Sequence, residues 1–392
     1  MRALAMKKRL FFIPHIRTAR NLKGARVLLR LDLNEPLARG RVLDDFRIRR
    51  SIPTIKFLKK KGARVIILAH EDHAKGTLRA VSERLNRFTR VSFEASPVSL
   101  LRDIGSFMKN GSAVLLENIR RYAGEEKNSV SFARTLARMG DVYVNDAFSV
   151  CHRTHASVVS LPRFLPSYSG LLMHEEIAHL SLALSPKHPF VFILGGAKFS
   201  TKMPLIKKYL QVADSVFVGG ALSNNFYKVM GMEIGRSHVE NPGTALLPLL
   251  KNEKLILPSD VRVVGRKGER VVRPGEVSVS DCISDAGDET VRELSQLVAR
   301  ARLVVFNGPL GNYEEGFDKG TNMLLSAIGE SRATSIVGGG HTLDLIGQLG
   351  IEKKFTFVST GGGAMIEFLA KGTLPGIEAL KKAGSNKRIF QK

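Results

Sequence analysis

FILGG at Phe192–Gly196 is the first of five apolar runs in the second half of the chain that end in glycine clusters. The others are VFVGG (Val216–Gly220), VVFNGPLG (Val304–Gly311), SIVGGG (Ser335–Gly340) and FVSTGGG (Phe357–Gly363). An apolar, β-branched run that ends in glycine predicts a strand followed by a sharp turn, where the backbone can come close to a ligand. When a helix follows, its N-terminal N–H groups favour a bound anion. Five such runs predict a phosphate-binding crevice along the carboxyl ends of a parallel sheet.

The first half of the chain also contains apolar runs, but these end in polar side chains. They are RVLLRLDLN (Arg26–Asn34), RVIILAH (Arg64–His70), AVLLENIR (Ala113–Arg120) and VYVNDAF (Val142–Phe148), with helical patterns between them. At the same place in the sheet, the first half therefore offers charged side chains and the second half offers bare backbone. This difference predicts a small anionic substrate on the first half and a nucleotide on the second.

The length and the alternation of strands and helices predict two domains. A chain of 392 residues is long for a single core. Alternating strands and amphipathic helices are typical of parallel sheets covered by helices on both faces. We therefore expect an α/β fold with two Rossmann-like, doubly wound domains joined by a helical hinge. The predicted boundaries are an N-terminal domain at 1–170, a hinge helix at 171–186 and a C-terminal domain at 187–373, the last with a β-rich excursion at Ile256–Val279.

Composition narrows the class of protein and its partners. The formal net charge is +24, but Lys and Arg are spread along the chain and aromatic residues do not alternate with them. We interpret the charge as a basic surface that attracts small anions; a nucleic-acid-binding protein is the alternative, and it predicts strongly salt-dependent binding. No apolar run approaches the roughly 20 residues that span a bilayer. The two cysteines lie far apart in the sequence, which favours a reduced cytoplasmic setting.

Several long motifs, in order along nearly the whole chain, resemble the phosphoglycerate kinase family. They are RLDLNEP (Arg30–Pro36), DDFRIR (Asp44–Arg49), LLENIRRYAGEEKN (Leu115–Asn128), DVYVNDAFSVCHRTHAS (Asp141–Ser157), FILGGAKFSTK (Phe192–Lys202), FNGPLGNYE (Phe306–Glu314), SIVGGG (Ser335–Gly340) and STGGGAMIEFLAKGTLPGIEAL (Ser359–Leu380). The resemblance implies the phosphoglycerate kinase fold, with 3-phosphoglycerate on the N-terminal domain and a magnesium nucleotide on the C-terminal domain. It also implies that a tail at 374–392 packs back on the N-terminal domain, and that the protein is a cytoplasmic monomer.

The activity implied by this resemblance is reversible phosphoryl transfer from 1,3-bisphosphoglycerate to ADP, which gives 3-phosphoglycerate and ATP in glycolysis and gluconeogenesis. Such an enzyme is a phosphotransferase with a carboxyl group as acceptor (EC 2.7.2.3), and Mg²⁺ is its expected cofactor. Phosphoryl transfer needs in-line placement and charge neutralisation rather than a covalent enzyme intermediate. Arg47 and Lys198 are expected to converge on the transferring group when the cleft closes and excludes water.

The resemblance assigns site residues position by position. Arginine suits the phosphoglycerate because its fork matches carboxylate and phosphate oxygens. The residues expected to bind phosphoglycerate are Asp32, Asn34, Arg47, His70, His73, Arg120 and Arg153. Those expected to bind the nucleotide are Lys198, Lys202, Gly219, Gly220, Asn307, Glu314, Gly338, Gly339, Gly340, His341 and Thr342. The expected catalytic residues are Arg47, Lys198, Gly340 and Gly363.

Three departures from the family pattern lie among these residues. One is the family's lysine-rich AKVSDK, which here reads Ala197-Lys198-Phe199-Ser200-Thr201-Lys202 and loses an acid. His341 follows the glycine cluster where the family usually has an aspartate that helps to hold magnesium, and imidazole is a poor magnesium ligand. Asp344, three residues later, can lie on the same helix face and is the expected metal ligand. The family's HLGRP is here His70-Glu71-Asp72-His73-Ala74, which replaces an arginine by His73 and adds two acids.

The departures leave two interpretations of the activity. One is a divergent but active kinase, and the other is a degenerate family member that binds ligands with little turnover. Both phosphate lysines, Lys198 and Lys202, are present, together with Arg47, Arg120 and Arg153. These five cations favour the active enzyme.

Overall fold

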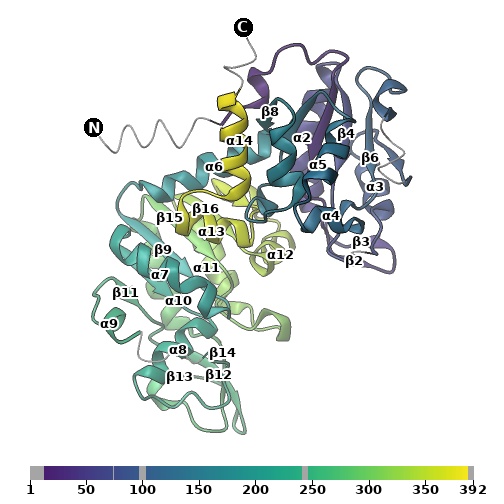
Figure 1. The fold of residues 1–392 in the computed structure, drawn as a ribbon. Coiled ribbons are helices and arrows are strands. Elements are labelled where there is room, and N and C mark those ends of the chain that lie inside the picture. Colours follow the sequence, from purple (N-terminus) through teal and green to yellow (C-terminus); the bar gives the residue numbers. More distant parts are fainter. Residues whose placement is uncertain (1–12, 74, 97–102, 241–245, 387–392) are drawn as a thin grey trace, which may run out of the picture. The chain divides into compact units, whose positions relative to one another are not determined.

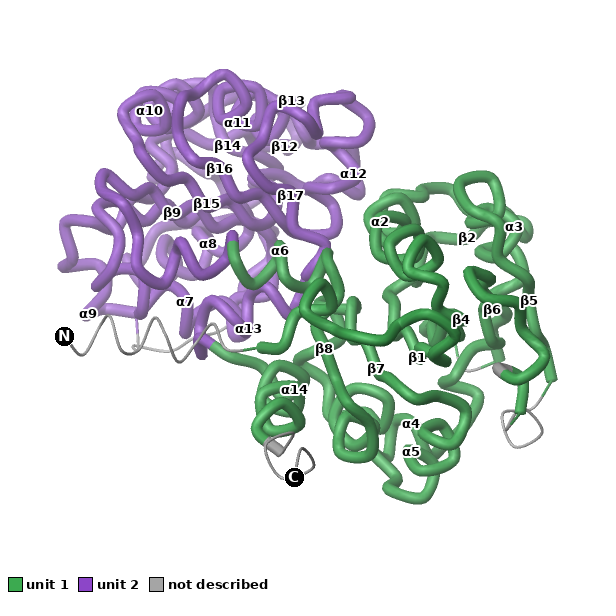
Figure 2. Tube along the Cα trace, turned by 90° about the horizontal axis from the view of Figure 1, so that it is seen from above, with its two compact units in different colours: residues 1–178, 373–392 green, residues 179–372 purple. Residues whose placement is uncertain are grey.

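The computed structural model describes residues 13–73, 75–96, 103–240 and 246–386. It has the predicted α/β class, with two six-stranded sheets in which every strand pair is parallel (Figure 1). The chain divides into two compact units (Figure 2). Unit 1 contains residues 1–178 and 373–392, and unit 2 contains residues 179–372.

The sheet of unit 1 has the strand order β5-β6-β4-β1-β7-β8. From β1 the chain passes to β4, then to the edge strand β5 and back to β6, and finally to β7 and β8 on the other side of β1. The sheet is therefore doubly wound, with a switch point between β1 and β7. The strands are β1 (Arg26–Arg30), β4 (Arg64–Leu68), β5 (Ser92–Glu94), β6 (Ala113–Leu116), β7 (Val142–Asn145) and β8 (Ser167–Ser169). A small antiparallel pair, β2 (Leu37–Ala38) and β3 (Arg41–Val42), lies apart from this sheet.

Helices cover both faces of this sheet. Figure 2 shows α2 (Phe46–Lys60) and α3 (Arg79–Asn86) on one face, and α4 (Ala123–Glu126) and α5 (Val130–Ala137) on the other. Ser129 caps α5 by accepting a hydrogen bond from the Phe132 N–H at 3.3 Å. The core packs apolar strand residues such as Leu29 and Ile67 against Ile55 and Leu58 of α2. The shorter helices are η1 (Ile16–Thr18), η3 (Ile104–Ser106), η4 (Ile119–Arg121), η5 (Phe148–Val150), η6 (Ala156–Ser160) and η7 (Leu161–Arg163).

The sheet of unit 2 has the order β11-β10-β9-β15-β16-β17 and its switch point lies between β9 and β15. The strands are β9 (Phe190–Leu194), β10 (Ser215–Val218), β11 (Leu255–Ile256), β15 (Leu303–Asn307), β16 (Thr334–Gly338) and β17 (Phe357–Ser359). β9 and β15 are buried at every position. Such continuous apolar strands are typical of a parallel sheet covered on both faces.

Two layers of helices enclose the unit 2 sheet. Figure 2 shows α10 (Asp288–Arg300), α11 (Lys319–Glu330) and α12 (Gly340–Leu349) on one face, and α7 (Phe199–Val212), α8 (Ala221–Val229) and α13 (Gly363–Lys371) on the other. α10 buries Val291, Leu294 and Val298 on one stripe, which explains why this sequence forms an amphipathic helix. The remaining helices are η8 (Ser181–Leu184), α9 (Leu247–Leu250), η10 (Pro274–Glu276), η11 (Tyr313–Glu315) and η12 (Glu352–Lys354).

The expected β-rich excursion of unit 2 is a three-stranded antiparallel sheet. It contains β12 (Val261–Gly265), β13 (Gly268–Val272) and β14 (Cys282–Ala286), with β12 in the middle. Val261 and Val263 face a small separate core with Tyr227 and Ile234. The excursion therefore has its own apolar support beside the main sheet.

The segment that connects the units begins with α6 (Leu171–Leu180) and continues as η8. The helical part of the expected connector is thus one α-helix followed by a tighter turn. The last helix, α14 (Pro375–Asn386), packs on β8, η6 and η7 within unit 1. Its Gly376 N–H donates to the Cys151 carbonyl at 2.9 Å. The end of the predicted tail, 387–392, lies outside the described residues.

The predicted strands of the first half are longer than the observed ones. RVLLRLDLN was expected to extend to Asn34, but β1 ends at Arg30. The Asp32 carboxylate accepts a hydrogen bond from the Asn34 N–H at 3.1 Å, and this local bond turns the backbone away from the ladder. Most polar residues at the ends of the predicted strands are likewise loop residues just beyond the sheet, although Asn145 is the last residue of β7.

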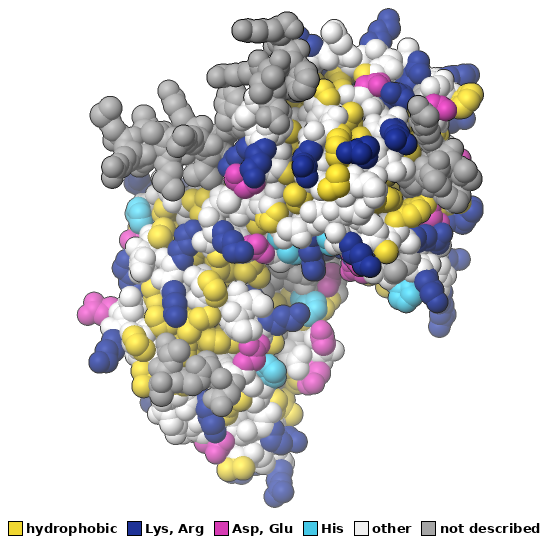
Figure 3. Space-filling model, viewed as in Figure 1, with side chains coloured by type: hydrophobic (Ala, Val, Ile, Leu, Met, Phe, Trp, Pro, Cys, Tyr) yellow, Lys and Arg dark blue, Asp and Glu magenta, His cyan; other side chains and the backbone are white. Residues whose placement is uncertain are grey.

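Figure 3 shows Lys and Arg side chains scattered over the displayed face of the molecule rather than gathered on one patch. This agrees with their even spread along the sequence. Among the described residues, no helix is both long enough and apolar enough to cross a membrane.

Truncation of a central side chain tests the core of unit 1. Leu29 in β1 is fully buried, whereas Leu43 is 67% exposed. We expect Leu29→Ala to lower the free energy of unfolding by about 2–5 kcal/mol, because it removes apolar contacts and leaves a cavity. Leu43→Ala is the matched control, with an expected change within about 0.5 kcal/mol. Urea unfolding measures both; equal effects would contradict this description of the core.

Candidate functional site

Asp32 lies just beyond β1, at the switch point of the unit 1 sheet. Its carboxylate accepts a hydrogen bond from the Ser149 hydroxyl, and it lies 3.7 Å from Nε of Arg47. Burial opposes ionisation of Asp32, but Arg47, His70 and the Ser149 bond outweigh it and lower the pKa to about 2. Asp32 is therefore an anion at neutral pH, and it holds the arginine beside it.

Arg47 lies in the first turn of α2 and reaches back to the β1 end. Its guanidinium also donates to the Asn34 carbonyl. The negative charge of Asp32 raises the pKa of Arg47, so the cation is fixed. These contacts bring together three of the residues predicted to bind phosphoglycerate.

His70 follows β4 and is almost fully buried. Its Nδ1 lies 3.2 Å from a terminal nitrogen of Arg30, which can only donate. Burial and the Arg30 charge lower the pKa of His70 to about 3. His70 is therefore neutral with its proton on Nε2, and it offers a hydrogen-bond donor rather than a positive charge.

Arg120 follows β6 and already has two carboxylates beside it. Its guanidinium pairs with Asp72, and its Nε lies 3.7 Å from Glu126. The backbone N–H of Arg120 donates to the Asn118 side chain at 3.0 Å. The structure thus places Arg120 beside Asn34 and His70, through their shared neighbour Asp72.

His73 and Arg153 differ from the other predicted phosphoglycerate ligands, since both are exposed. The carbonyl of His73 accepts hydrogen bonds from Asn118 and from the Gly76 N–H. Arg153 contributes to the electrostatic environment of His155, whose pKa falls to about 4 through burial, then Arg120 and Arg30. The structure therefore brings Asp32, Asn34, Arg47, His70 and Arg120 together, while the side chains of His73 and Arg153 face solvent.

Sequence reasoning did not identify a buried charged network beneath these residues. Arg30 is fully buried and donates to the Ser157 hydroxyl at 3.0 Å. That hydroxyl donates to Glu125 at 2.6 Å, and burial raises the pKa of this carboxyl. The available signal was Arg30 itself, a charged residue inside the apolar run RVLLRLDLN, since buried charges need partners. Its bond to His70 makes it a positioning residue for the site.

In unit 2, Lys202 lies at the switch point. It projects from α7, is 6% exposed, and its ammonium donates to the Gly195 carbonyl at 2.5 Å and the Asn307 carbonyl at 3.4 Å. These carbonyls follow or end the two central strands, β9 and β15. Burial lowers the pKa of Lys202 to about 8. Lys198, by contrast, is exposed at the start of α7.

The glycines after the strands allow backbones to pack against one another. A Cβ on Gly220, which has φ +60°, would lie 2.8 Å from the Gly196 nitrogen. A Cβ on Gly308, at φ +91°, would lie 2.7 Å from Nζ of Lys202. These positions therefore need glycine for the packing of the protein itself.

Two helices begin at the other glycine clusters. Gly340 is the first residue of α12 and Gly363 is the first residue of α13, and each follows a glycine with positive φ. In the first turn of α12, the Thr342 hydroxyl is buried and has no hydrogen-bond partner among the described residues. A buried hydroxyl without a partner is costly, so an acceptor on a bound molecule would satisfy it. Both helices can bind phosphate through their N-terminal N–H groups.

Other residues predicted to bind the nucleotide make contacts within unit 2. Asn307 directs its amide nitrogen to the Met365 sulfur at 3.5 Å. His341 has its Nε2 3.5 Å from the Glu314 carboxylate and stacks on Tyr313 with ring centroids 5.2 Å apart. Sequence reasoning did not foresee this partnership between His341 and Glu314. It follows from the fold, which brings η11 beside α12.

The carboxylates of the described residues do not form a cluster of ligands for Mg²⁺. Among the residues that the structure describes, no group of three His, Cys, Asp or Glu side chains could hold a metal ion. Asp344 lies on α12, one turn after Gly340, and is partly buried. Mg²⁺ commonly binds one or two carboxylates together with substrate phosphates. A single carboxylate one turn into α12 would be compatible with that mode.

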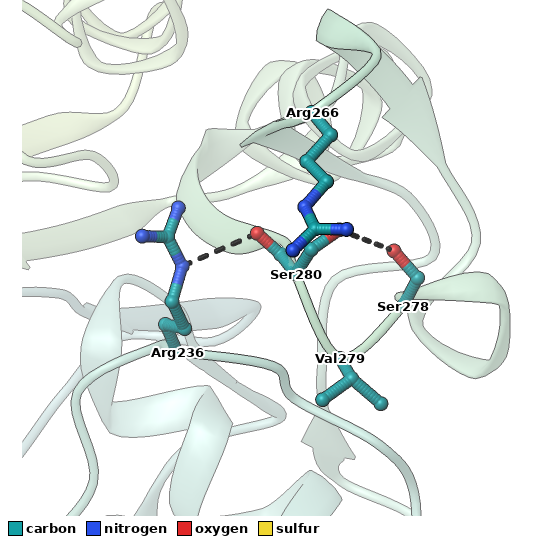
Figure 4. Close-up of a pocket in the computed structure, with 5 residues that line it drawn as sticks. All are labelled: Arg236, Arg266, Ser278, Val279 and Ser280. Atoms are coloured by element: carbon teal, nitrogen blue, oxygen red, sulfur yellow. Dashed lines mark hydrogen bonds between the residues drawn. The ribbon is translucent and has the colours of Figure 1, made fainter.

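A basic hollow lies elsewhere in unit 2, on the antiparallel excursion. Its volume is about 660 Å³, and Arg236, Arg266, Ser278, Val279 and Ser280 line it. Figure 4 shows Arg236 and Arg266 flanking Ser280, whose carbonyl accepts from Arg236 at 3.2 Å. None of the residues predicted to bind the nucleotide lines this hollow.

Comparison with known proteins shows which family the chain resembles. The family model described as phosphoglycerate kinase matches residues 16–372. A phosphoglycerate kinase of Dictyoglomus turgidum is 40% identical and covers 92% of this chain and 96% of its own length. A phosphoglycerate kinase of Caulobacter sp. is 39% identical and covers 92% of this chain and 98% of its own length. The solved structure of phosphoglycerate kinase from Coxiella burnetii is 34% identical, covers 94% of this chain and 99% of its own, and superposes with a TM-score of 0.82. The corresponding structure from Pyrococcus horikoshii gives 30% identity, coverages of 96% and 100%, and a TM-score of 0.84.

Burial of the Lys202 ammonium predicts a pH-dependent stability. The pKa of Lys202 is lowered from 10.5 to about 8, so the unfolded chain binds more protons between these pH values. Stability therefore rises with pH across this window. We expect the free energy of unfolding of the wild type to gain up to about 3 kcal/mol relative to Lys202→Met between pH 8 and 10.5. Urea unfolding at several pH values measures this.

Lys198→Met is the matched control for this prediction. Because Lys198 is exposed, we expect its stability difference from the wild type to stay nearly constant over the same pH window. A constant difference for Lys202→Met as well would show that its ammonium is not buried in solution.

Proposed function

The chain belongs to the phosphoglycerate kinase family, and on that premise we propose how its residues divide the reaction. It is a phosphotransferase that moves a phosphoryl group reversibly from 1,3-bisphosphoglycerate to ADP, giving 3-phosphoglycerate and ATP in glycolysis. The observation that carries the assignment is the division between the two sheets. Paired arginines lie at the carboxyl edge of one sheet, and a buried lysine with glycine-led helices lies at the carboxyl edge of the other.

We assign the phosphoglycerate to the carboxyl edge of the unit 1 sheet. Arg47 and Arg120 would bind its carboxylate and phosphate oxygens, because arginine forks match such groups. Neutral His70 would donate from Nε2, and Asn34 would bind the hydroxyl. Asp32 would not bind the substrate directly. Its carboxylate would hold Arg47 in place. Exposed His73 and Arg153 would attract the anion at longer range.

We assign the nucleotide to the carboxyl edge of the unit 2 sheet. The phosphates would lie at the N-termini of α12 and α13, near Gly338–Gly340, Thr342 and Gly363, with Lys198 and Lys202 as cations. Gly219 and Gly220 would pass close to the base, and Glu314 would reach the ribose. Support comes from the Thr342 hydroxyl, which is buried and lacks a partner among the described residues.

Catalysis would then depend on placement and charge. The transferring phosphoryl group carries its charge on three equatorial oxygens, and no covalent enzyme intermediate is needed. We propose that Arg47 and Lys198 neutralise this charge, together with the N–H groups at Gly340 and Gly363. Contact with both cations requires the two units to close on their substrates, with α6 and η8 as the hinge. Closure would also exclude water that hydrolyses the acyl phosphate.

Mg²⁺ would supply positive charge to the nucleotide phosphates in this reaction. Asp344 is the residue that we propose to hold it, because oxygen is the ligand atom that Mg²⁺ prefers. His341 would not hold it, since its imidazole already lies beside Glu314. We further propose that the protein acts as a monomer in the cytoplasm, in line with two unpaired cysteines, one of them buried.

A coupled phosphoglycerate kinase assay with varied Mg²⁺ tests the assignment. We expect the wild type to turn over and to require a divalent ion. His341→Asp adds a carboxylate on the phosphate side of α12. It should lower the Mg²⁺ concentration for half-maximal rate by about 3- to 10-fold.

His341→Asn is the matched control, because it removes the imidazole without adding a charge. If it lowered the Mg²⁺ requirement equally, release of Glu314 rather than a new ligand would explain the effect. The degenerate-member interpretation has a separate test in Arg47→Ala and Lys198→Ala. Wild-type turnover no higher than in these variants would show that the chain is not an active kinase.

A further inference from the structure

Two of the residues assigned to the phosphoglycerate are already bonded to a carboxylate of the chain itself. Asp72, two residues after His70, accepts a hydrogen bond from the Asn34 amide at 2.8 Å through Oδ2. Its other oxygen, Oδ1, pairs with the Arg120 guanidinium. The backbone N–H of Asp72 donates to the Asn34 side-chain oxygen at 3.2 Å. One carboxylate thus makes the kinds of contact expected of an anionic substrate.

The side chain of Asn118 holds the backbone on both sides of Asp72 in place. Asn118, which is fully buried, accepts from the Glu71 N–H at 3.2 Å and donates to the carbonyls of Glu71 and His73 at 3.1 and 3.2 Å. The same side chain accepts from the Arg120 N–H at 3.0 Å. One buried amide therefore fixes both the segment that carries Asp72 and the residue with which Asp72 pairs.

The partners of Asp72 differ strongly in exposure. The Arg120 side chain is 9% exposed and that of Asp72 is 68% exposed. Burial opposes ionisation of Asp72, but the bonds from Asn34 and Arg120 lower its pKa, so it is an anion at neutral pH. The buried Nε of Arg120 has no hydrogen-bond acceptor among the described residues. Arg120 thus keeps an unused donor, although a carboxylate already covers its outer side.

We propose that Asp72 is an internal competitor for the phosphoglycerate site. In the free enzyme its carboxylate takes the place of substrate oxygens on Asn34 and Arg120, and the incoming acid displaces it. Displacement is feasible because the Asp72 side chain is 68% exposed, so water can hydrate its carboxylate once it leaves Arg120. Asp72 therefore weakens binding of the acid without entering the chemistry. This inference rests on the proposed assignment of Asn34 and Arg120.

The Asp72→Asn variant tests the proposal, because it removes the charge and keeps the shape. We expect the KM for 3-phosphoglycerate to fall by about 3- to 10-fold, with kcat and the KM for ATP nearly unchanged. Isothermal titration of 3-phosphoglycerate without nucleotide should give the same decrease in Kd. Because salt screens exposed charges, the difference should shrink at high ionic strength.

Glu126→Gln is the matched control, since it removes one negative charge at 3.7 Å from the same guanidinium. We expect less than about a twofold change, because Glu126 does not touch Asn34 in the way that Asp72 does. An equal effect of the two variants would overturn the proposal, because the cause would then be net charge alone. An unchanged or raised KM in Asp72→Asn would also overturn it, because Asp72 would then support Arg120.

Arg120→Ala separates this inference from the proposed function. If it does not weaken 3-phosphoglycerate binding, the assignment of the site is wrong. If it weakens binding while Asp72→Asn does not tighten it, the assignment stands and the competitor role is wrong. In the double variant, Asp72→Asn should add no tightening, because the interaction energy belongs to the pair. Thermal unfolding of each variant checks that the fold is intact.

Discussion

The parallel pairing of all strands in the two large sheets is the constraint on which both sites depend. Parallel strands place their carboxyl ends on one edge, and the switch point leaves that edge open to a ligand. In unit 2, the Lys202 ammonium links the two central strands at this edge, because it donates hydrogen bonds to carbonyls at the ends of β9 and β15. The glycines at Gly220 and Gly308 let these backbones approach each other. The crevice is therefore built from main-chain groups and one buried cation.

Unit 1 uses the same edge differently, because each cation there has its own anion. Arg47 lies beside Asp32, Arg120 beside Asp72, and Arg30 is linked through Ser157 to Glu125. Such pairing limits the cost of keeping several arginines in a partly buried region before a substrate arrives. It also fixes the tautomer of His70, whose Nδ1 receives a hydrogen bond from Arg30. If the phosphoglycerate binds here as we propose, it would meet a site that is already organised and largely neutralised.

Two of the departures from the family pattern act through charge pairing. Asp72 adds an anion to Arg120, and His341 lies beside Glu314 rather than in a cluster of metal ligands. Both changes leave the sheets intact, since the residues lie beyond the strand ends. Divergence at these positions is thus expected to alter affinity for ligands more than the fold.

Periodicity and glycine placement were sufficient to predict the α/β class, the two sheets and nine of their twelve strands, because these signals are local in the chain. The short edge strands β5, β8 and β11 were not predicted. Sequence also supplied the polar residues after the strands, through the motifs that resemble the family. It could not show which of them meet, since a contact such as Asn34 with Asp72 joins residues 38 positions apart. The buried role of Arg30 and the pairing of His341 with Glu314 likewise required the tertiary structure. The sequence determined the edge at which each site lies; only the packed fold decided the charge and the free donors at that edge, because these depend on burial and on long-range neighbours.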